Sequence, residues 1–226
     1  MLDFSKTKLS ATRSIWSYHK VQLLRSAISR GRPRFMNLKK AGLYLDVGCG
    51  PSLRPQNINL DYHWRPGVDI CCDVANGLPL PDSYVAGIYS EHCLEHVSLR
   101  SMPFILREFF RVLQPGAFIR IIVPDLEIYV IRYNEFLATG EHSMPYAADD
   151  PTVDGVYTPA MTFNRIMHDL GHQFIYDFPT LAKLLAAVGF ATITKTKFGV
   201  GSDAALLMDA PEREIESLYV EARKLG

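Results

Sequence analysis

The stretch from Leu43 to Asp61, LYLDVGCGPSLRPQNINLD, constrains the fold more than any other part of the chain. It begins with an apolar run, residues 43–47, that has the length and composition of a buried strand. The run breaks at a turn that contains Gly48 and Gly50, and a second run, residues 57–60, ends on Asp61. The stretch therefore predicts a strand, a glycine turn, a second strand and an acid at its tip.

This unit indicates a ligand that contains a nucleoside. Glycine adopts positive φ without a Cβ penalty and lets the backbone approach a ligand closely. An acid at the end of the second strand can accept hydrogen bonds from two ribose hydroxyls. A dinucleotide site needs a third glycine in a G-x-G-x-x-G pattern, and Leu53 stands at that position. Because Arg54-Pro55 follows, no useful helix fits before the next strand, which argues against a dinucleotide.

An acid at the end of the first strand, Asp46, followed by two glycines without a pyrophosphate helix, resembles motif I of the class I S-adenosylmethionine-dependent methyltransferases. Three later segments extend this resemblance in the right order: Asp73-Val74 after a short strand at 69–71, residues 78–89, and residues 111–116. The resemblance covers residues 43–124. It implies an α/β, Rossmann-like fold with a seven-stranded, mostly parallel sheet flanked by helices, and S-adenosyl-L-methionine as the cofactor.

The resemblance also implies a set of cofactor-binding residues. Asp61 would hold the ribose, Asp73 the adenine amino group, and the backbone amide of Val74 the adenine ring. Ligands of open α/β sheets bind at the carboxyl ends of the strands, so we expect the acids of this set, with Ser90 and Asp125, to converge on one crevice. The full set is Asp46, Gly48, Cys49, Gly50, Asp61, Tyr62, Asp73, Val74 and Ser90.

Residues 90–97, SEHCLEHV, follow the predicted fourth strand. Their tail, LEHV, resembles a segment of small-molecule methyltransferases, including the ubiquinone-pathway O-methyltransferases, in which two acids and a histidine at i, i+3 and i+4 can hold a divalent cation. This chain offers His92, Glu95 and His96, which would share a helical face. The alternative is that Glu95 and His96 orient the loop by hydrogen bonds. Because no fourth ligand is in view, we favour that alternative and predict no metal site.

The residues from 126 to 178 are expected to form a lid insertion after the fifth strand, with a helix at 127–137. Residues 171–177, GHQFIYD, followed by 181–190, resemble bacterial methyltransferases encoded with polysaccharide-assembly genes. Methyl transfer to a hydroxyl needs alignment and a base, and histidine is the natural base near neutral pH. His168 and His172 are the candidates, and Asp125, Asp169 or Asp177 would fix a tautomer or bind sugar hydroxyls. Alternatively, a histidine beside the aromatic residues holds the lid closed.

The C-terminal third is expected to complete the sheet. Residues 181–188 predict an apolar helix face that stops at Gly189, and residues 191–197 and 204–208 predict the last two strands, the final one antiparallel. Pro211 is predicted to open a charged terminal helix that runs to Lys224. Earlier in the chain, Ser101 is predicted to cap the helix that precedes the fifth strand.

The formal net charge of zero hides a strong asymmetry. Residues 1–42 carry ten lysines and arginines against Asp3 alone, and an apolar stripe from Ile15 to Ile28 predicts a helix there. We therefore divide the chain into a basic N-terminal helical segment, 1–42, and a methyltransferase domain, 43–226. The helix would either pack on the domain or contact an anionic membrane surface or a phosphorylated substrate. A nucleic-acid partner is not expected, because the segment lacks interleaved exposed aromatic residues.

Composition and cysteine usage favour a cytoplasmic enzyme. The four cysteines show no C-x-x-C spacing, no apolar run reaches a membrane span of ~18 residues, and the N-terminus is too polar for a signal peptide. The family's Asn/Asp-Pro-Pro-aromatic segment is absent, which argues against amine groups of nucleic-acid bases. The expected function is methyl transfer from S-adenosylmethionine to a hydroxyl of a small molecule or sugar. The alternatives are N- or C-methylation of a metabolite or peptide, and a non-catalytic cofactor-binding regulatory or scaffolding protein.

Overall fold

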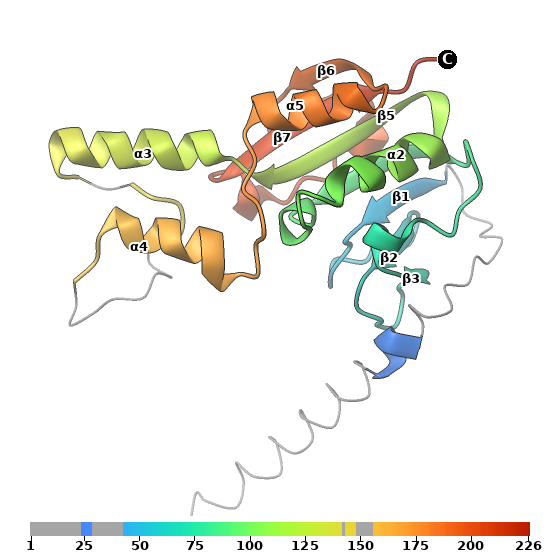
Figure 1. Ribbon diagram of the computed structural model, residues 1–226, viewed down its shortest axis with the longest axis horizontal. Helices are drawn as coiled ribbons and strands as arrows, with labels where there is room; N and C mark the ends of the chain where they lie inside the picture. The colour runs from blue at the N-terminus through green and yellow to red at the C-terminus, as the bar shows by residue number, and fades with distance from the viewer. Residues whose placement is uncertain (1–23, 29–42, 142, 148–155) are drawn as a thin grey trace, which may run out of the picture.

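The computed structural model describes residues 24–28, 43–141, 143–147 and 156–226 (Figure 1). Most of the predicted N-terminal helix lies outside these residues, and 24–28 are helical. The strands are β1 (Tyr44–Val47), β2 (Ile58–Asp61), β3 (Ile70–Cys71), β4 (Val85–Glu91), β5 (Leu113–Pro124), β6 (Ala191–Lys195) and β7 (Ser217–Arg223). The α-helices are α2 (Met102–Val112), α3 (Leu126–Thr139), α4 (Pro159–Asn164) and α5 (Phe178–Ala187). Short helical turns are η1 (Val74–Asn76), η2 (Leu94–His96), η4 (Arg165–Asp169), η5 (Ala204–Leu206) and η6 (Pro211–Arg213).

The strands form one seven-stranded sheet with the order β3-β2-β1-β4-β5-β7-β6. Neighbouring strands are parallel except at β7, which is antiparallel to both β5 and β6. The predicted seven-stranded, mostly parallel sheet is therefore confirmed. The chain passes from β1 outward to β2 and β3 and then returns to β4 on the other side of β1. This switch in direction between β1 and β4 is the place where open α/β sheets bind ligands.

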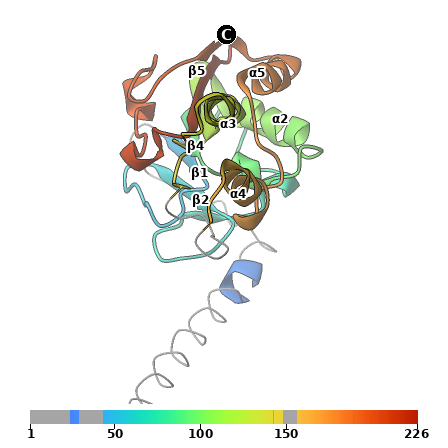
Figure 2. The same cartoon turned by 90° about the vertical axis from the view of Figure 1, so that its left-hand side faces the viewer.

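The two faces of the sheet are covered differently (Figure 2). On one face, α2 and α5 pack their apolar residues, such as Phe109 and Leu185, against the inner strands in the main hydrophobic core. On the other face, residues of the 196–216 segment cover a smaller cluster that contains Tyr89, Ile122 and Tyr219. Because the central strands are covered on both faces, burial in β1 and β2 does not alternate, and even the polar Asn59 and Asp61 of β2 are buried.

Two helices flank the site end of the sheet. Helix α2 begins after Ser101, but the Ser101 side chain makes no capping hydrogen bond and its backbone is already helical, so the predicted cap is wrong. Helix α3 leaves the carboxyl end of β5 and extends beyond the sheet together with α4 (Figure 1). Tyr129, Met144, Ile166 and Ile175 form a separate small core there. Within the described residues, no helix combines the length and apolarity needed to cross a membrane.

The C-terminal prediction is wrong in two places. The run at 204–208 contains the short turn η5 instead of a strand, and the predicted terminal helix is strand β7 after the turn η6. Leu218 and Val220 join the main core, whereas Tyr219 packs on the opposite face, which is the two-residue period of a strand. The glutamates, alanine and arginine of this segment favour a helix, but pairing along β5 overrides that propensity.

Arg120 anchors the segment that covers the second face. Its side chain is fully buried in the middle of β5, and its Nη2 atom lies 2.5 Å from the Asp209 carboxylate. Its Nη1 atom donates to Glu221 in β7 at 3.1 Å and to the carbonyl of Val200 at 3.0 Å. The Lys197 carbonyl accepts a further hydrogen bond from Nη2 at 3.1 Å. The Arg120 guanidinium therefore ties the 197–209 loop to β5 and β7.

We expect Arg120→Met to lower the free energy of unfolding by about 3–5 kcal/mol, because it leaves two buried carboxylates without their cation. Urea denaturation measures this loss. Arg132→Met is the matched control, since Arg132 forms an exposed ion pair with Glu135 at 3.0 Å. The control should change stability by less than about 1 kcal/mol. Equal, small effects of the two variants would contradict the anchoring role.

Candidate functional site

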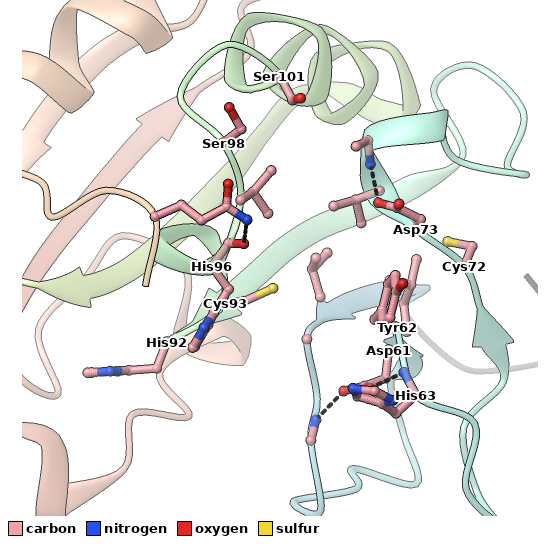
Figure 3. A pocket seen from close by; sticks show the side chains of 18 residues that line it. Asp61, Tyr62, His63, Cys72, Asp73, His92, Cys93, His96, Ser98 and Ser101 are labelled. Atoms are coloured by element: carbon pink, nitrogen blue, oxygen red, sulfur yellow. Dashed lines mark hydrogen bonds between the residues drawn. The ribbon is translucent and has the colours of Figure 1, made fainter. Parts of the chain in front are cut away.

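A cavity of about 650 Å³ opens at the carboxyl ends of β1 to β4, within the range of small-molecule sites. Figure 3 shows Asp61 and Asp73 on one side of it and His92 and His96 on the other. The segments after four strands supply nearly all of its wall, and Gln173 comes from the 126–178 insertion. The lining residues are Val47, Gly48, Gly50, Leu60, Asp61, Tyr62, His63, Cys72, Asp73, Val74, Ala75, His92, Cys93, His96, Val97, Ser98, Ser101 and Gln173.

The glycine turn is held against the end of β2 by hydrogen bonds. The backbone N–H groups of Gly48 and Cys49 donate to the Leu60 carbonyl at 2.8 and 3.1 Å. Asp61 then accepts from the Gly50 N–H at 2.9 Å through one carboxylate oxygen and from the His63 N–H at 2.6 Å through the other. Each carboxylate oxygen can accept more than one hydrogen bond, so Asp61 retains acceptor capacity toward the cavity.

Gly48 is required at its position for two reasons. Its φ of +75° lies in the left-handed region, which residues with a Cβ rarely adopt. A Cβ there would also lie 2.4 Å from the Sγ atom of Cys93, which follows β4. The turn after β1 and the segment after β4 therefore touch directly, and glycine makes this contact possible.

The expected convergence of polar residues holds for part of the set. Asp61 and Asp73 both line the cavity, and the Asp73 carboxylate also accepts from the Ala75 N–H at 2.9 Å to begin η1. Asp46 does not reach it, because its buried carboxylate pairs with Arg54 at 2.5 Å beneath the glycine turn. Burial raises the pKa of Asp46, although Arg54 lowers it.

Three further candidates lie outside the cavity wall. Cys49 and Ser90 are buried and do not line the cavity. Asp125 begins α3 by accepting from the Glu127 N–H at 3.0 Å and pairs with Lys195 at 3.1 Å. The sequence could not separate these residues from the cavity set, because each also stands at the end of a strand.

A cluster of three histidines around Glu95 borders the cavity. The Nε2 atoms of His96 and His172 each lie 3.9 Å from the Glu95 Oε1 atom, and the Nδ1 atom of His92 lies 3.4 Å from it. The rings of His96 and His172 meet edge to face at 4.7 Å between centroids. His92 and His96 line the cavity, whereas His172 is not among the lining residues. We call these four residues the histidine cluster.

Burial sets the charge of this cluster. The Glu95 side chain is fully buried, and desolvation raises its pKa to about 8. Desolvation also lowers the pKa of His92 to about 3 and lowers that of His172. Both histidines are therefore neutral near pH 7, while Glu95 is largely protonated there. Neutral imidazole offers a lone pair that can accept a proton or bind a cation.

The two histidines that the sequence proposed as bases are placed differently. His172 belongs to the histidine cluster, and its Nδ1 atom lies 2.6 Å from the Ile166 carbonyl. The His168 side chain is exposed on η4, away from the cavity lining. His92 and His96, which the sequence did not propose as bases, line the cavity instead.

Gln173, Ser98 and Ser101 are cavity residues that the sequence reasoning missed. The available signal was the position of the two serines directly after LEHV, in a loop that follows a strand end. Gln173 had no comparable signal, because its placement depends on how the 126–178 insertion folds back. Its N–H donates to the Glu95 carbonyl at 2.7 Å, and its side-chain amide donates to the His96 carbonyl at 2.8 Å.

Comparison with protein-family models finds one match in this part of the chain. Residues 54–121 match the family model described as a methyltransferase domain, a stretch that contains Asp61, Asp73 and most of the histidine cluster. No curated protein matches the chain.

Several solved structures are similar in fold. They include an S-adenosylmethionine-dependent methyltransferase from Archaeoglobus fulgidus, with 16% identity, a TM-score of 0.49, and coverage of 90% of this chain and 94% of that one. A second, from Aquifex aeolicus, has 16% identity, a TM-score of 0.45, and coverage of 84% and 85%. Phosphoethanolamine N-methyltransferase 2 of Haemonchus contortus, in complex with S-adenosyl-L-methionine, has 10% identity, a TM-score of 0.48, and coverage of 93% and 53%.

We expect Gly48→Ala to destabilise the protein by more than Gly50→Ala. Both glycines have positive φ, +75° and +55°, so both variants carry a backbone cost of about 1–2 kcal/mol. A Cβ at Gly50 meets nothing nearer than 3.9 Å, whereas one at Gly48 collides with Cys93. Chemical denaturation of each variant measures the difference. Adding Cys93→Gly to Gly48→Ala removes both Cys93 atoms that the new Cβ meets, Sγ and Cβ, and should recover part of the loss. No recovery would contradict the steric explanation.

Proposed function

We propose that this chain is an S-adenosylmethionine-dependent methyltransferase that methylates a hydroxyl group of a small molecule or sugar. The match of residues 54–121 to a methyltransferase domain supports the proposal. The observation that carries the proposal is the composition of the cavity wall. Acids suited to a nucleoside lie on one side, and the histidines His92 and His96 lie on the other. A hydroxyl needs its proton removed during methyl transfer, and a histidine can remove it.

The cofactor is S-adenosylmethionine, and we propose how the cavity holds it. The Asp61 carboxylate, at the tip of β2, accepts hydrogen bonds from the ribose hydroxyls. Asp73 and the backbone of Val74, beyond β3, contact the adenine. The glycine turn at 48–50 lies against the methionine portion, because small residues there allow close approach. His92 and His96, on the opposite wall of the cavity, would then be available to the acceptor.

The transfer itself is an in-line displacement. The hydroxyl oxygen attacks the methyl carbon, the carbon–sulfur bond breaks, and the sulfonium becomes the neutral thioether of S-adenosylhomocysteine. The proton of the hydroxyl passes to the histidine cluster. We place the base at His96, beside His172, because His96 opens onto the cavity and His168 does not. Alignment of oxygen, carbon and sulfur supplies the rest of the acceleration.

We also propose roles for the two segments that flank the cofactor site. The 126–178 insertion acts as a lid over the acceptor end, since Gln173 lines the cavity and bonds to the loop after β4. The basic segment at 1–42 would contact an anionic membrane surface or an anionic substrate. Its described residues, 24–28, lie against the domain: Arg25 lies over the Trp64 ring at 4.6 Å, and Ser26 accepts from the Trp64 N–H at 2.7 Å. The expected location remains the cytoplasm.

We expect Asp61→Ala to weaken S-adenosylhomocysteine binding by roughly tenfold or more. Two ribose hydroxyls lose a charged acceptor, and such hydrogen bonds contribute about 1.5–3 kcal/mol each. Isothermal titration calorimetry gives the affinity. Asp125→Ala is the matched control, because its carboxylate pairs with Lys195 outside the cavity. An Asp61→Ala variant that is folded and binds as tightly as the wild type would contradict the ribose role.

We expect His96→Ala to reduce methyl transfer by about 100-fold or more, with S-adenosylhomocysteine binding retained. Transfer of a labelled methyl group to a panel of sugars, phenols, alcohols and amines identifies the acceptor class. His168→Ala should remain close to the wild type, since that side chain is exposed. Labelling of amines in preference to hydroxyls would replace the hydroxyl proposal with N-methylation. Cofactor binding without transfer to any acceptor would favour a regulatory or scaffolding protein.

A further inference from the structure

The carboxyl group of Glu95 stands out among the buried acids. Its side chain is fully buried, and within the described residues neither of its oxygens has a hydrogen-bond partner. Other buried acids are satisfied: Glu216 accepts from the Tyr129 hydroxyl at 2.5 Å and from Arg213 at 3.0 Å. A buried carboxyl group without a partner costs free energy. Its surroundings therefore need a ligand that the protein itself does not provide.

The imidazole of His172 presents a lone pair to Glu95. The Nδ1 atom of His172 lies 2.6 Å from the Ile166 carbonyl, which can only accept, so Nδ1 carries the proton. The Nε2 atom is then unprotonated in the neutral ring and lies 3.9 Å from Glu95 Oε1. A hydrogen bond from one ring nitrogen to a backbone carbonyl is the usual way to orient a histidine that binds a metal through the other.

The cluster is assembled by the backbone before any ligand arrives. The Glu95 carbonyl accepts from the N–H groups of Gln173 and Phe174 at 2.7 and 3.2 Å. The side-chain amide of Gln173 donates to the His96 carbonyl at 2.8 Å. These bonds hold the 172–174 segment against η2, so that His172 lies next to a pair of residues far from it in the sequence. Such pre-organisation lowers the cost of binding.

We propose that Glu95, His96 and His172 bind a divalent cation of the first transition series. One ligand atom from each lies within 4.8 Å of the other two. Zinc holds its ligands at 2.0–2.2 Å, so tetrahedral ligand atoms stand roughly 3.4 Å apart. The two Glu95–histidine distances of 3.9 Å therefore close by about 0.5 Å on binding. Two imidazoles and one carboxylate suit zinc or its neighbours better than magnesium, which prefers oxygen.

His92 stays outside this ligand set, in contrast to the sequence-based set of His92, Glu95 and His96. Its Nε2 atom forms a hydrogen bond with the Ser217 hydroxyl at 2.8 Å, which leaves Nδ1 to face Glu95 at 3.4 Å. In the cation-bound state His92 orients the Glu95 carboxylate. The unused coordination positions of the cation face the cavity on the side of His96, since three protein ligands leave at least one position open.

The catalytic consequence rests on the proposed function. A hydroxyl bound at the open position is acidified by the cation, as metal-bound water is. Its proton then leaves to solvent, and the resulting alkoxide attacks the sulfonium methyl. With the cation bound, His96 and His172 are ligands, so the cation takes over the role that free imidazole has without it. Occupation of the cluster also pairs the buried Glu95 carboxylate with a charge.

The test is a titration of the full-length, metal-stripped protein with Zn²⁺, followed by competition with a chromophoric chelator. We expect one equivalent to bind, and we expect Glu95→Gln and His172→Gln each to weaken binding by at least tenfold. His168→Gln is the matched control, because His168 is an exposed histidine in the same segment, and it should bind like the wild type. Circular dichroism and S-adenosylhomocysteine affinity confirm that each variant is folded.

Co²⁺ provides a second measurement on the wild-type protein that does not depend on variants that fold. Visible ligand-field absorption and paramagnetic shifts of imidazole protons are expected on binding at the cluster. Failure of the wild type to bind either ion, or equal affinity in the wild type and both ligand variants, overturns the inference. The readouts are independent of methyl transfer. Zinc binding at the cluster without methylation of any hydroxyl would support the cation site and overturn the proposed acceptor. Hydroxyl methylation that chelators do not affect would support the proposed acceptor and overturn the cation site.

Discussion

The contact between the glycine turn and the tip of β2 is the constraint on which the site depends. The N–H groups of Gly48, Cys49 and Gly50 all point to the end of β2, where they meet a carbonyl and the Asp61 carboxylate. These N–H groups are therefore not available to bind a phosphate, as the N–H groups at a helix N-terminus would be. The turn is therefore compact, and it leaves Asp61 and the cavity open to a nucleoside without a pyrophosphate.

The opposite wall follows from the same turn. Because Gly48 has no Cβ, Cys93 can pack directly on it, and the chain after β4 then continues into η2 with Glu95 and His96. The carbonyl of Glu95 in turn receives the 173–174 segment. A single close approach thus connects the cofactor side of the cavity to the histidine cluster. The protein keeps an unpaired carboxyl group in this cluster at a cost to stability, which is a common trade at functional sites.

Buried charge is handled in two different ways in this molecule. Arg120 meets two carboxylates and several carbonyls, so its network is satisfied and fixes the 197–209 loop on the sheet. The nearest imidazole nitrogens lie 3.4–3.9 Å from the Glu95 carboxyl group and form no hydrogen bond with it. Burial therefore favours the neutral acid. The Arg120 network stabilises the fold, whereas the environment of Glu95 changes when a ligand enters the cavity. Satisfied networks specify a structure, whereas unsatisfied groups mark places where a ligand changes the balance.

The sequence alone determined the first four strands, the glycine turn and the acids Asp61 and Asp73, because strand period, turn residues and strand ends are local patterns. It did not determine β7, whose glutamates and alanine favour a helix until pairing with β5 makes a strand. Nor did it place His172 beside Glu95 or move Asp46 out of the cavity onto Arg54. Those outcomes depend on contacts between residues that meet only in the folded chain. Local patterns therefore predicted the wall of the cavity that carries Asp61 and Asp73, and tertiary structure alone decided the wall beside the histidine cluster.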